Sequence, residues 1–166
     1  MQFQETAITT PPSPTAAQRP VANVGALVSR SARAFARRVA VKTATRSLSY
    51  AELEQRSNRL ANALLGMGLS RGDRVGIYLP NRAEIVEVEL ACYKAGLVKA
   101  PFNARLSPAE VGEIAANSDA AVIVTTAARV ESFRAPFRGA LPHLLLVDEI
   151  GSEGGSYESA LARASD

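Results

Sequence analysis

The feature that most constrains the fold is an alternation of short apolar runs with segments of helical periodicity, from residue 39 to residue 147. Residues 75–79 are apolar on both faces, which is typical of a buried strand in a parallel sheet. Helical stretches of about 10–15 residues separate the runs, so consecutive strands are expected to be joined by crossovers. The chain is therefore predicted to form an α/β fold, a mostly parallel sheet with helices on both faces and right-handed crossovers.

The spacing of apolar residues also places the individual elements. Strands are expected at residues 39–43, 48–50, 75–79, 98–102, 121–125 and 144–147, and helices at residues 23–35, 82–95 and 127–135. Ser49 and Glu52 form a capping-box pattern, in which hydroxyl and carboxylate each bond a backbone amide at the start of a helix. Ser107 and Glu110 repeat this pattern, with Pro108 at the first helical position.

Two of the expected helices carry apolar stripes. The helix after Ser49 ends near Gly66 and Gly68, because glycine accepts the left-handed backbone of a helix C-cap. Its stripe comprises Leu53, Ser57, Leu60, Ala61 and Leu64. The helix at residues 23–35, with Asn23 as its N-cap, has a stripe of Val24, Leu27, Val28, Ser31, Ala32 and Phe35.

Composition excludes several classes of protein. Apolar residues make up 47% of the 166, enough for a core and too many for a disordered chain. One cysteine and one histidine make a disulfide framework or a Cys/His zinc cluster implausible. No apolar run approaches the roughly 18 residues of a membrane span, and residues 1–20 show no secretory signal. We therefore expect a cytoplasmic protein.

The charge pattern does not indicate a nucleic-acid partner. The first 70 residues carry 9 Lys and Arg against 3 Asp and Glu, whereas the net charge of the whole chain is +3. The basic half includes Arg30, Arg33, Arg37 and Arg38, and only Phe35 supplies an aromatic ring nearby. A nucleic-acid surface would combine such arginines with interleaved aromatic residues or a known motif. We interpret these arginines as a solvated helix face.

A search for catalytic groups gives no complete site. His143 is the only histidine, and Cys92 lies in the middle of an expected helix, so both are interpreted as structural. Glu84 and Glu87 share a helix face, a pairing common on helix surfaces. Glycines follow the 144–147 strand at residues 151–155, but Glu153 opposes an anion cradle there. The residues alone predict an α/β unit without a self-contained active site.

Four segments, in order, resemble motifs of the adenylate-forming enzymes, a family that includes acyl- and aryl-CoA ligases, peptide-synthetase adenylation domains and luciferases. They are LSYAEL at residues 48–53, RGDRV and LPN at residues 71–81, YKAG through PFN at residues 93–103, and NARL at residues 103–106. The resemblance covers residues 23–150 and implies the N-terminal part of the large domain of such an enzyme. Lys99 departs from it, because the family usually has a small or apolar residue there.

The resemblance implies a two-step ligation that uses ATP, Mg²⁺ and CoA. A fatty or aromatic carboxylate attacks the α-phosphate of ATP to give an acyl-adenylate and pyrophosphate, and the CoA thiol then displaces AMP. The family's phosphate loop, adenine-side segment, ribose-binding aspartate and C-terminal lysine are not found in these 166 residues. We therefore expect an inactive scaffold whose main partner is the rest of its own chain.

The same resemblance divides the chain and names candidate site residues. Residues 1–22 are expected to be a flexible leader, residues 23–150 the α/β subdomain, and residues 151–166 a Gly/Ser loop leading toward the phosphate loop. In CoA-using members the nucleotide lies near loops that correspond to residues 103–106 and to the turn after the 121–125 strand. Arg105 and Arg129 are thus candidates for contacts to CoA phosphates.

Two other interpretations remain open at this point. The chain can be a stand-alone, non-catalytic α/β binding or interaction module, or part of an adenylation enzyme that loads a carrier protein instead of CoA. A longer reading frame with a phosphate loop would separate the module from the enzyme. As an isolated piece, the chain is expected to expose apolar surface and to self-associate.

Overall fold

The computed structural model describes residues 24–133, 142–148 and 157–166. The strands are β1 (Val39–Lys42), β2 (Ser47–Ser49), β3 (Arg74–Tyr78), β4 (Val98–Pro101), β5 (Ala120–Thr125) and β6 (His143–Leu146). The helices are α1 (Val24–Phe35), α2 (Tyr50–Gly66), α3 (Ala83–Ala95), α4 (Pro108–Ser118), the 3-10 helix η2 (Ala127–Phe133) and α5 (Tyr157–Arg163). The expected leader at residues 1–22, the N-cap Asn23 and the glycine-rich loop at residues 151–155 lie outside the described residues.

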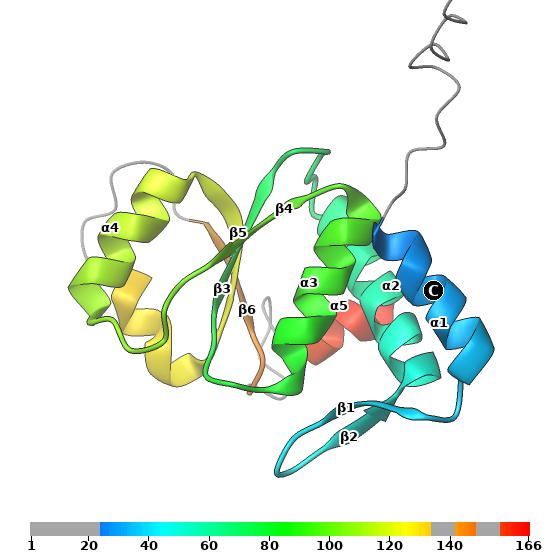
Figure 1. The fold of residues 1–166 in the computed structure, drawn as a ribbon. Coiled ribbons are helices and arrows are strands. Elements are labelled where there is room, and N and C mark those ends of the chain that lie inside the picture. Colours follow the sequence, from blue (N-terminus) through cyan, green and yellow to red (C-terminus); the bar gives the residue numbers. More distant parts are fainter. Residues whose placement is uncertain (1–23, 134–141, 149–156) are drawn as a thin grey trace, which may run out of the picture.

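Four strands form a parallel sheet in the order β4-β3-β5-β6, which confirms the predicted α/β fold. Helices α2, α3 and α5 cover one face, and α4 and η2 cover the other (Figure 1). β1 and β2 form a separate antiparallel pair beside α2. Alternate residues of β5 point into the two halves of the core: Val122 and Val124 into one, Ile123 into the other. Both faces of the sheet are therefore covered by helices, as a parallel sheet with helical crossovers requires.

Both predicted capping boxes are present. Ser49 Oγ accepts a hydrogen bond from the Glu52 amide, and the Glu52 carboxylate accepts one from the Ser49 amide. Ser107 and Glu110 make the same exchange at the start of α4. All five residues of the stripe predicted for α2 are buried. Local sequence patterns were therefore sufficient to place the first turn of both helices and, in α2, the buried face as well.

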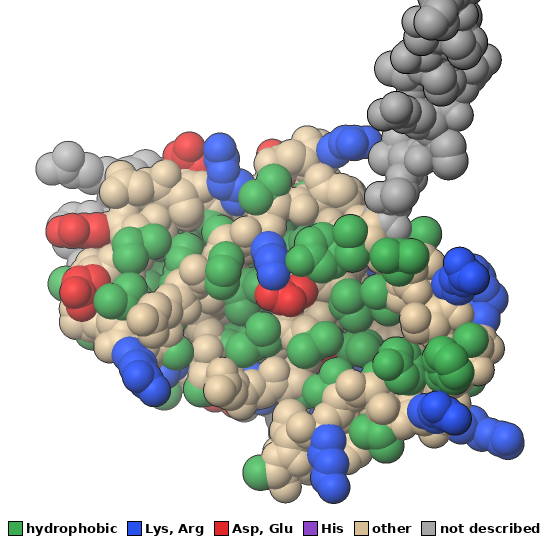
Figure 2. Space-filling model, in the orientation of Figure 1, with side chains coloured by type: hydrophobic (Ala, Val, Ile, Leu, Met, Phe, Trp, Pro, Cys, Tyr) green, Lys and Arg blue, Asp and Glu red, His purple; other side chains and the backbone are tan. Residues whose placement is uncertain are grey.

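The largest side chains of the stripe predicted for α1 are mostly exposed in the described structure. Val24, Leu27 and Phe35 are 46–59% exposed, and the buried residues of α1 are the small Gly25 and Ala32. α1 packs on α2 and α3, and the small Gly25 and Ala32 are the residues that it buries fully. Hydrophobic side chains gather on this face of the molecule, over α1 and α3 (Figure 2). The helix was predicted correctly, whereas its buried face was predicted only in part: Ala32 is buried and Val28 and Ser31 are half-buried, but the buried Gly25 was not in the stripe.

Candidate functional site at the carboxyl edge of the sheet

The sheet has a topological switch point between β3 and β5. β3 leads through α3, on one face, to β4, whereas β5 leads through η2, on the other face, to β6. The chain therefore leaves two adjacent strands toward opposite faces. In open α/β sheets such a point, at the carboxyl ends of the strands, is where ligands bind. The turns after β3, β4 and β5 therefore form the candidate site.

Tyr78, the last residue of β3, and Arg129, in η2, shape this edge. Tyr78 ends β3 opposite Thr125 of β5, and the Thr125 hydroxyl donates to the Tyr78 carbonyl at 3.1 Å. The Arg129 guanidinium carbon lies 4.5 Å from the centre of the Tyr78 ring. Arg129 Nη1 donates to the Ala104 carbonyl at 3.0 Å, and the Tyr78 hydroxyl donates to the Leu106 carbonyl at 3.3 Å. The loop at residues 103–106 is therefore held by two hydrogen bonds, one from the Arg129 guanidinium and one from the Tyr78 hydroxyl.

Arg105 lies in the loop that Arg129 holds. Its side chain is exposed, and its backbone amide donates to Asn103 Oδ1 at 3.0 Å, which fixes a turn. The structure thus brings together the two segments that the sequence singled out, residues 103–106 and the turn after β5. Arg129 is half-buried and already bonded to Ala104, so it also serves to shape the loop.

Arg82 marks the other side of the switch point. It follows the turn after β3 and donates to both carboxylate oxygens of Glu84, at 2.8 and 3.1 Å. Burial raises the pKa of Glu84, but the hydrogen bonds from Arg82 and the backbone, together with the charges of Arg82 and Arg46, hold that pKa below its usual value. Asp148, beyond β6, accepts a hydrogen bond from the Ala127 amide at 2.9 Å. Charged groups of both signs therefore line this end of the sheet.

Sequence reasoning misplaced the acidic residues of α3. Glu84 and Glu87 were interpreted as a surface pair, yet Glu84 is 7% exposed and Glu87 is fully buried. Glu87 accepts hydrogen bonds from Arg56 of α2 and from Tyr157 of α5, both at 2.7 Å. The sequence did contain a signal, because both acids fall on the same helical stripe as the buried Val88.

Lys94, in the YKAG segment, has a structural position. Its Nζ lies 2.7 Å from each of three acceptors on α2: Glu54 Oε2, Ser57 Oγ and Asn58 Oδ1. An ammonium group has three protons to donate. The lysine therefore ties the end of α3 to α2, away from the carboxyl edge.

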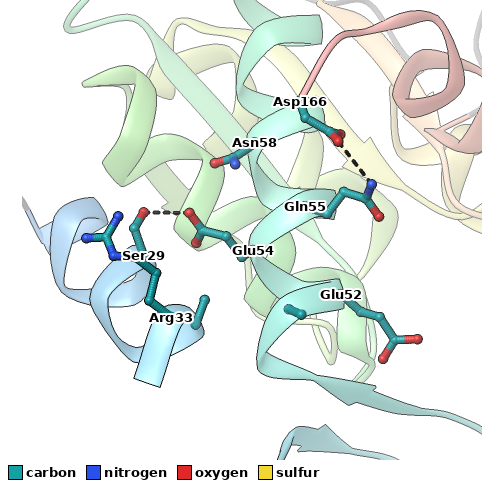
Figure 3. Close-up of a pocket in the computed structure, with 9 residues that line it drawn as sticks. Ser29, Arg33, Glu52, Glu54, Gln55, Asn58 and Asp166 are labelled. Carbon is teal, nitrogen blue, oxygen red and sulfur yellow. Dashed lines mark hydrogen bonds between the residues drawn. The ribbon is translucent and has the colours of Figure 1, made fainter. Parts of the chain in front are cut away.

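A surface pocket of about 480 Å³ lies between α1 and α2 and reaches Asp166 (Figure 3). Its polar side chains bond to one another: Ser29 donates to Glu54 at 2.5 Å, and Gln55 donates to Asp166 at 3.0 Å. None of the carboxyl-edge residues lines it. We therefore do not regard this pocket as the candidate site.

The remaining candidate groups do not form a nucleophilic site. Cys92 is fully buried, and burial raises its pKa to about 12, which disfavours the reactive thiolate. His143 is exposed at the start of β6. Within the described ranges, no group of three or more His, Cys, Asp and Glu side chains is arranged to hold a metal ion. Among the helices of those ranges, each is too short or too polar to cross a bilayer.

Residues 28–164 match the family model described as AMP-binding enzyme. A medium/long-chain-fatty-acid–CoA/3-oxocholest-4-en-26-oate–CoA ligase of Mycobacterium marinum is 37% identical over 102 residues, which are 61% of this chain and 18% of that protein. A feruloyl-CoA synthase of Amycolatopsis sp is 38% identical over 112 residues, which are 68% of this chain and 23% of that protein. The chain thus spans less than a quarter of the length of these relatives.

Solved structures agree on the fold. The anthranilate CoA ligase AuaEII superposes with a TM-score of 0.78 at 24% identity, over 86% of this chain and 28% of that one. A fatty acyl CoA synthetase of Mycobacterium tuberculosis gives 0.73 at 27% identity, over 86% and 28%. The described fold therefore matches part of an adenylate-forming enzyme, as the sequence motifs predicted, and the chain belongs to the AMP-binding enzyme family.

Proposed function

We propose that the complete protein is an ATP-dependent ligase that joins a carboxylic acid to CoA through an acyl-adenylate. The observation that carries this proposal is the family match over residues 28–164, together with curated relatives that are CoA ligases. The named substrates of those relatives range from fatty acids to ferulate. A fatty or aromatic acid is accordingly the proposed substrate class.

The described residues would act mainly as a scaffold in this reaction. Activating a carboxylate with ATP requires donors and Mg²⁺ that offset charge on the transferring phosphoryl group. The family's phosphate loop, which supplies such donors in its members, is not found in these 166 residues. ATP and Mg²⁺ are therefore proposed to bind residues outside the described ranges, and the parallel sheet would hold those residues rigid.

The carboxyl edge is proposed to contact the phosphates of CoA. Arginine suits this role because its planar fork offers several N–H donors to a phosphate. Arg105 is exposed, and within the described residues the guanidinium of Arg129 makes a single hydrogen bond, from Nη1 to Ala104. The remaining N–H groups of both side chains support a role as anion contacts beside residues 103–106.

The experiment that tests the ligase uses the complete gene product. Radioactive pyrophosphate exchange into ATP is measured with a panel of fatty and aromatic acids, and thioester formation is then measured with CoA. Exchange with at least one acid, followed by acyl-CoA, is the expected result. Exchange without acyl-CoA, but with acyl transfer to a carrier protein, would favour the carrier-loading alternative. No exchange with any acid would contradict the proposal and favour a non-catalytic module.

A further inference from the structure

Glu87 places a carboxylate in the interior of the protein. Its side chain is fully buried, and its two oxygens accept hydrogen bonds from different elements. Arg56 Nε of α2 donates to Oε1, and the Tyr157 hydroxyl of α5 donates to Oε2, both at 2.7 Å. A buried carboxylate is costly unless its oxygens are paired in this way. The buried Glu87 carboxylate is therefore stable only while Arg56 and Tyr157 both stay in place.

Helix α5 depends on these contacts for its own position. It has seven residues, whereas isolated helices of fewer than about 12–15 residues are only marginally stable. Tyr157 and Leu161 are its buried residues. Arg56 also donates to both carboxylate oxygens of Glu158, at 3.0 and 2.6 Å. The first turn of α5 is thus held through Glu87 and Arg56.

The same cluster extends to the carboxyl edge of the sheet. Arg46 Nη1 lies 3.9 Å from a carboxylate oxygen of Glu87 and 3.9 Å from one of Glu84. Glu84 in turn is bonded by Arg82, directly after the turn that follows β3. Charge pairs therefore connect α5 with the edge that carries the candidate site, although Tyr157 is 75 positions beyond Arg82 in the chain.

Buried ion pairs contribute little stability compared with apolar side chains of similar volume, so stability is a weak reason for this cluster. Instead, the hydrogen bonds to the two carboxylate oxygens of Glu87 fix the relative positions of Arg56 and Tyr157. We propose that Glu87 is a positioning residue that couples α5, through Tyr157 and Arg56, to Arg82 and the turn after β3. The effect of Glu87 on CoA binding rests on the proposed function. The positioning role of Glu87 is independent of that function.

Amide hydrogen exchange, followed by mass spectrometry, tests the coupling in the protein with Tyr157→Phe. This variant removes one hydroxyl and leaves the ring. Exchange is expected to become about tenfold faster both in residues 157–163 and in the turn at residues 79–83, since a hydrogen bond to a charged group contributes about 1.5–3 kcal/mol. The matched control is Tyr50→Phe, which removes the hydroxyl of a tyrosine that is not part of the Glu87 cluster and whose ring lies 6.3 Å from that of Phe35. Faster exchange confined to residues 157–166 would overturn the proposal.

A triple variant separates positioning from stability. Arg56→Leu, Glu87→Leu and Tyr157→Phe together replace the charged centre with apolar groups. We expect a thermal unfolding midpoint no lower than that of the wild type, with exchange in residues 79–83 still faster. Wild-type exchange there would count against the proposal, whether or not the midpoint changes.

Calorimetric titration of CoA into the complete gene product tests the link to the site. Tyr157→Phe is expected to weaken CoA binding about threefold, in the range of coupling between separated positions. An unchanged dissociation constant would remove the link to CoA. A wild-type protein that binds no CoA would instead contradict the proposed CoA contact, and the exchange measurements would still decide the positioning role.

Discussion

The guanidinium of Arg129 stacks on the ring of Tyr78, with 4.5 Å between its central carbon and the ring centre. This contact joins the turn after β5 to the last residue of β3. Both side chains also bond the loop after β4, through the carbonyls of Ala104 and Leu106. The ends of three neighbouring strands are therefore connected by two side chains, at the edge where a ligand is expected.

The first prediction concerns the stability that Arg129 provides. Arg129→Ala removes the cation–π contact and the hydrogen bond to Ala104, and should lower the free energy of unfolding by about 1–2 kcal/mol. Urea denaturation measures the change. The control is Arg71→Ala, an exposed arginine at the opposite end of the sheet, for which a change within about 0.5 kcal/mol is expected. Equal effects of the two variants would contradict the assigned contacts.

The second prediction concerns close packing at Gly76 in β3. A Cβ built there would lie 2.9 Å from Ile123 Cγ1 and 3.0 Å from the Phe102 ring. Gly76→Ala should therefore destabilise the fold by about 1–3 kcal/mol through overpacking. Gly66→Ala, at the end of α2 with nothing within 4 Å, should stabilise it by about 0.4–1 kcal/mol. Chemical denaturation of both variants measures the two changes in the free energy of unfolding. If Gly76→Ala leaves that free energy unchanged, Ile123 and Phe102 can move to accommodate the added methyl group, and the prediction is wrong.

Much of this fold could be predicted from local sequence, because the decisive signals are local. The capping boxes at Ser49 and Ser107 act within one helical turn, and the apolar run at residues 75–79 already specifies burial on both faces. The glycines predicted at the end of α2 were likewise informative: Gly68, two residues after the helix ends at Gly66, takes φ = 93°, in the left-handed region. Such features depend little on the rest of the molecule.

The parts that could not be predicted depend on contacts between distant segments. In α1, which packs on α2 and α3, the stripe included the buried Ala32 but omitted the buried Gly25, and it included Leu27, which is exposed. Burial of Glu87 depends on Tyr157, 70 residues away. At the candidate site, the sequence indicated Arg105 and Arg129 through family resemblance, but not the stacking of Arg129 on Tyr78, which links two strands.

The third prediction is a pH dependence of the α4 capping box. Hydrogen bonds from the Ser107 side chain and backbone lower the pKa of Glu110. The folded pKa is thus below the unfolded value of about 4.3, so this contribution to stability is present above that pH and is lost as the pH falls through the folded pKa. Ser107→Ala should flatten the dependence of stability on pH between about pH 5 and pH 3.

Urea unfolding at several pH values measures that slope. Ser118→Ala is the control, because Ser118 bonds the Ala115 carbonyl at the other end of α4 and no carboxylate. It should lower stability equally at each pH. A slope that Ser107→Ala leaves unchanged would show that Glu110 is not the titrating group.

The fourth prediction is self-association through α1. Leu27, in α1, is 59% exposed. Hydrophobic side chains gather over α1 and α3 (Figure 2). Contiguous exposed apolar surface favours association, so the protein should sediment as a concentration-dependent mixture, and Leu27→Glu should shift it toward monomer. Ile114→Glu, at a 41% exposed residue of α4, is the control and should have a smaller effect. A wild-type protein that sediments as a monomer at all concentrations would contradict this expectation.

The central claim, that the carboxyl edge belongs to a CoA ligase and meets CoA phosphates, is tested most directly by the KM for CoA of the complete gene product. Arg105→Ala is predicted to raise that KM about tenfold, because a charge-assisted bond to a phosphate contributes about 1.5–3 kcal/mol. ATP–pyrophosphate exchange should stay at the wild-type rate, and Arg71→Ala should change neither quantity. An unchanged KM for CoA in both Arg105→Ala and Arg129→Lys would contradict the account.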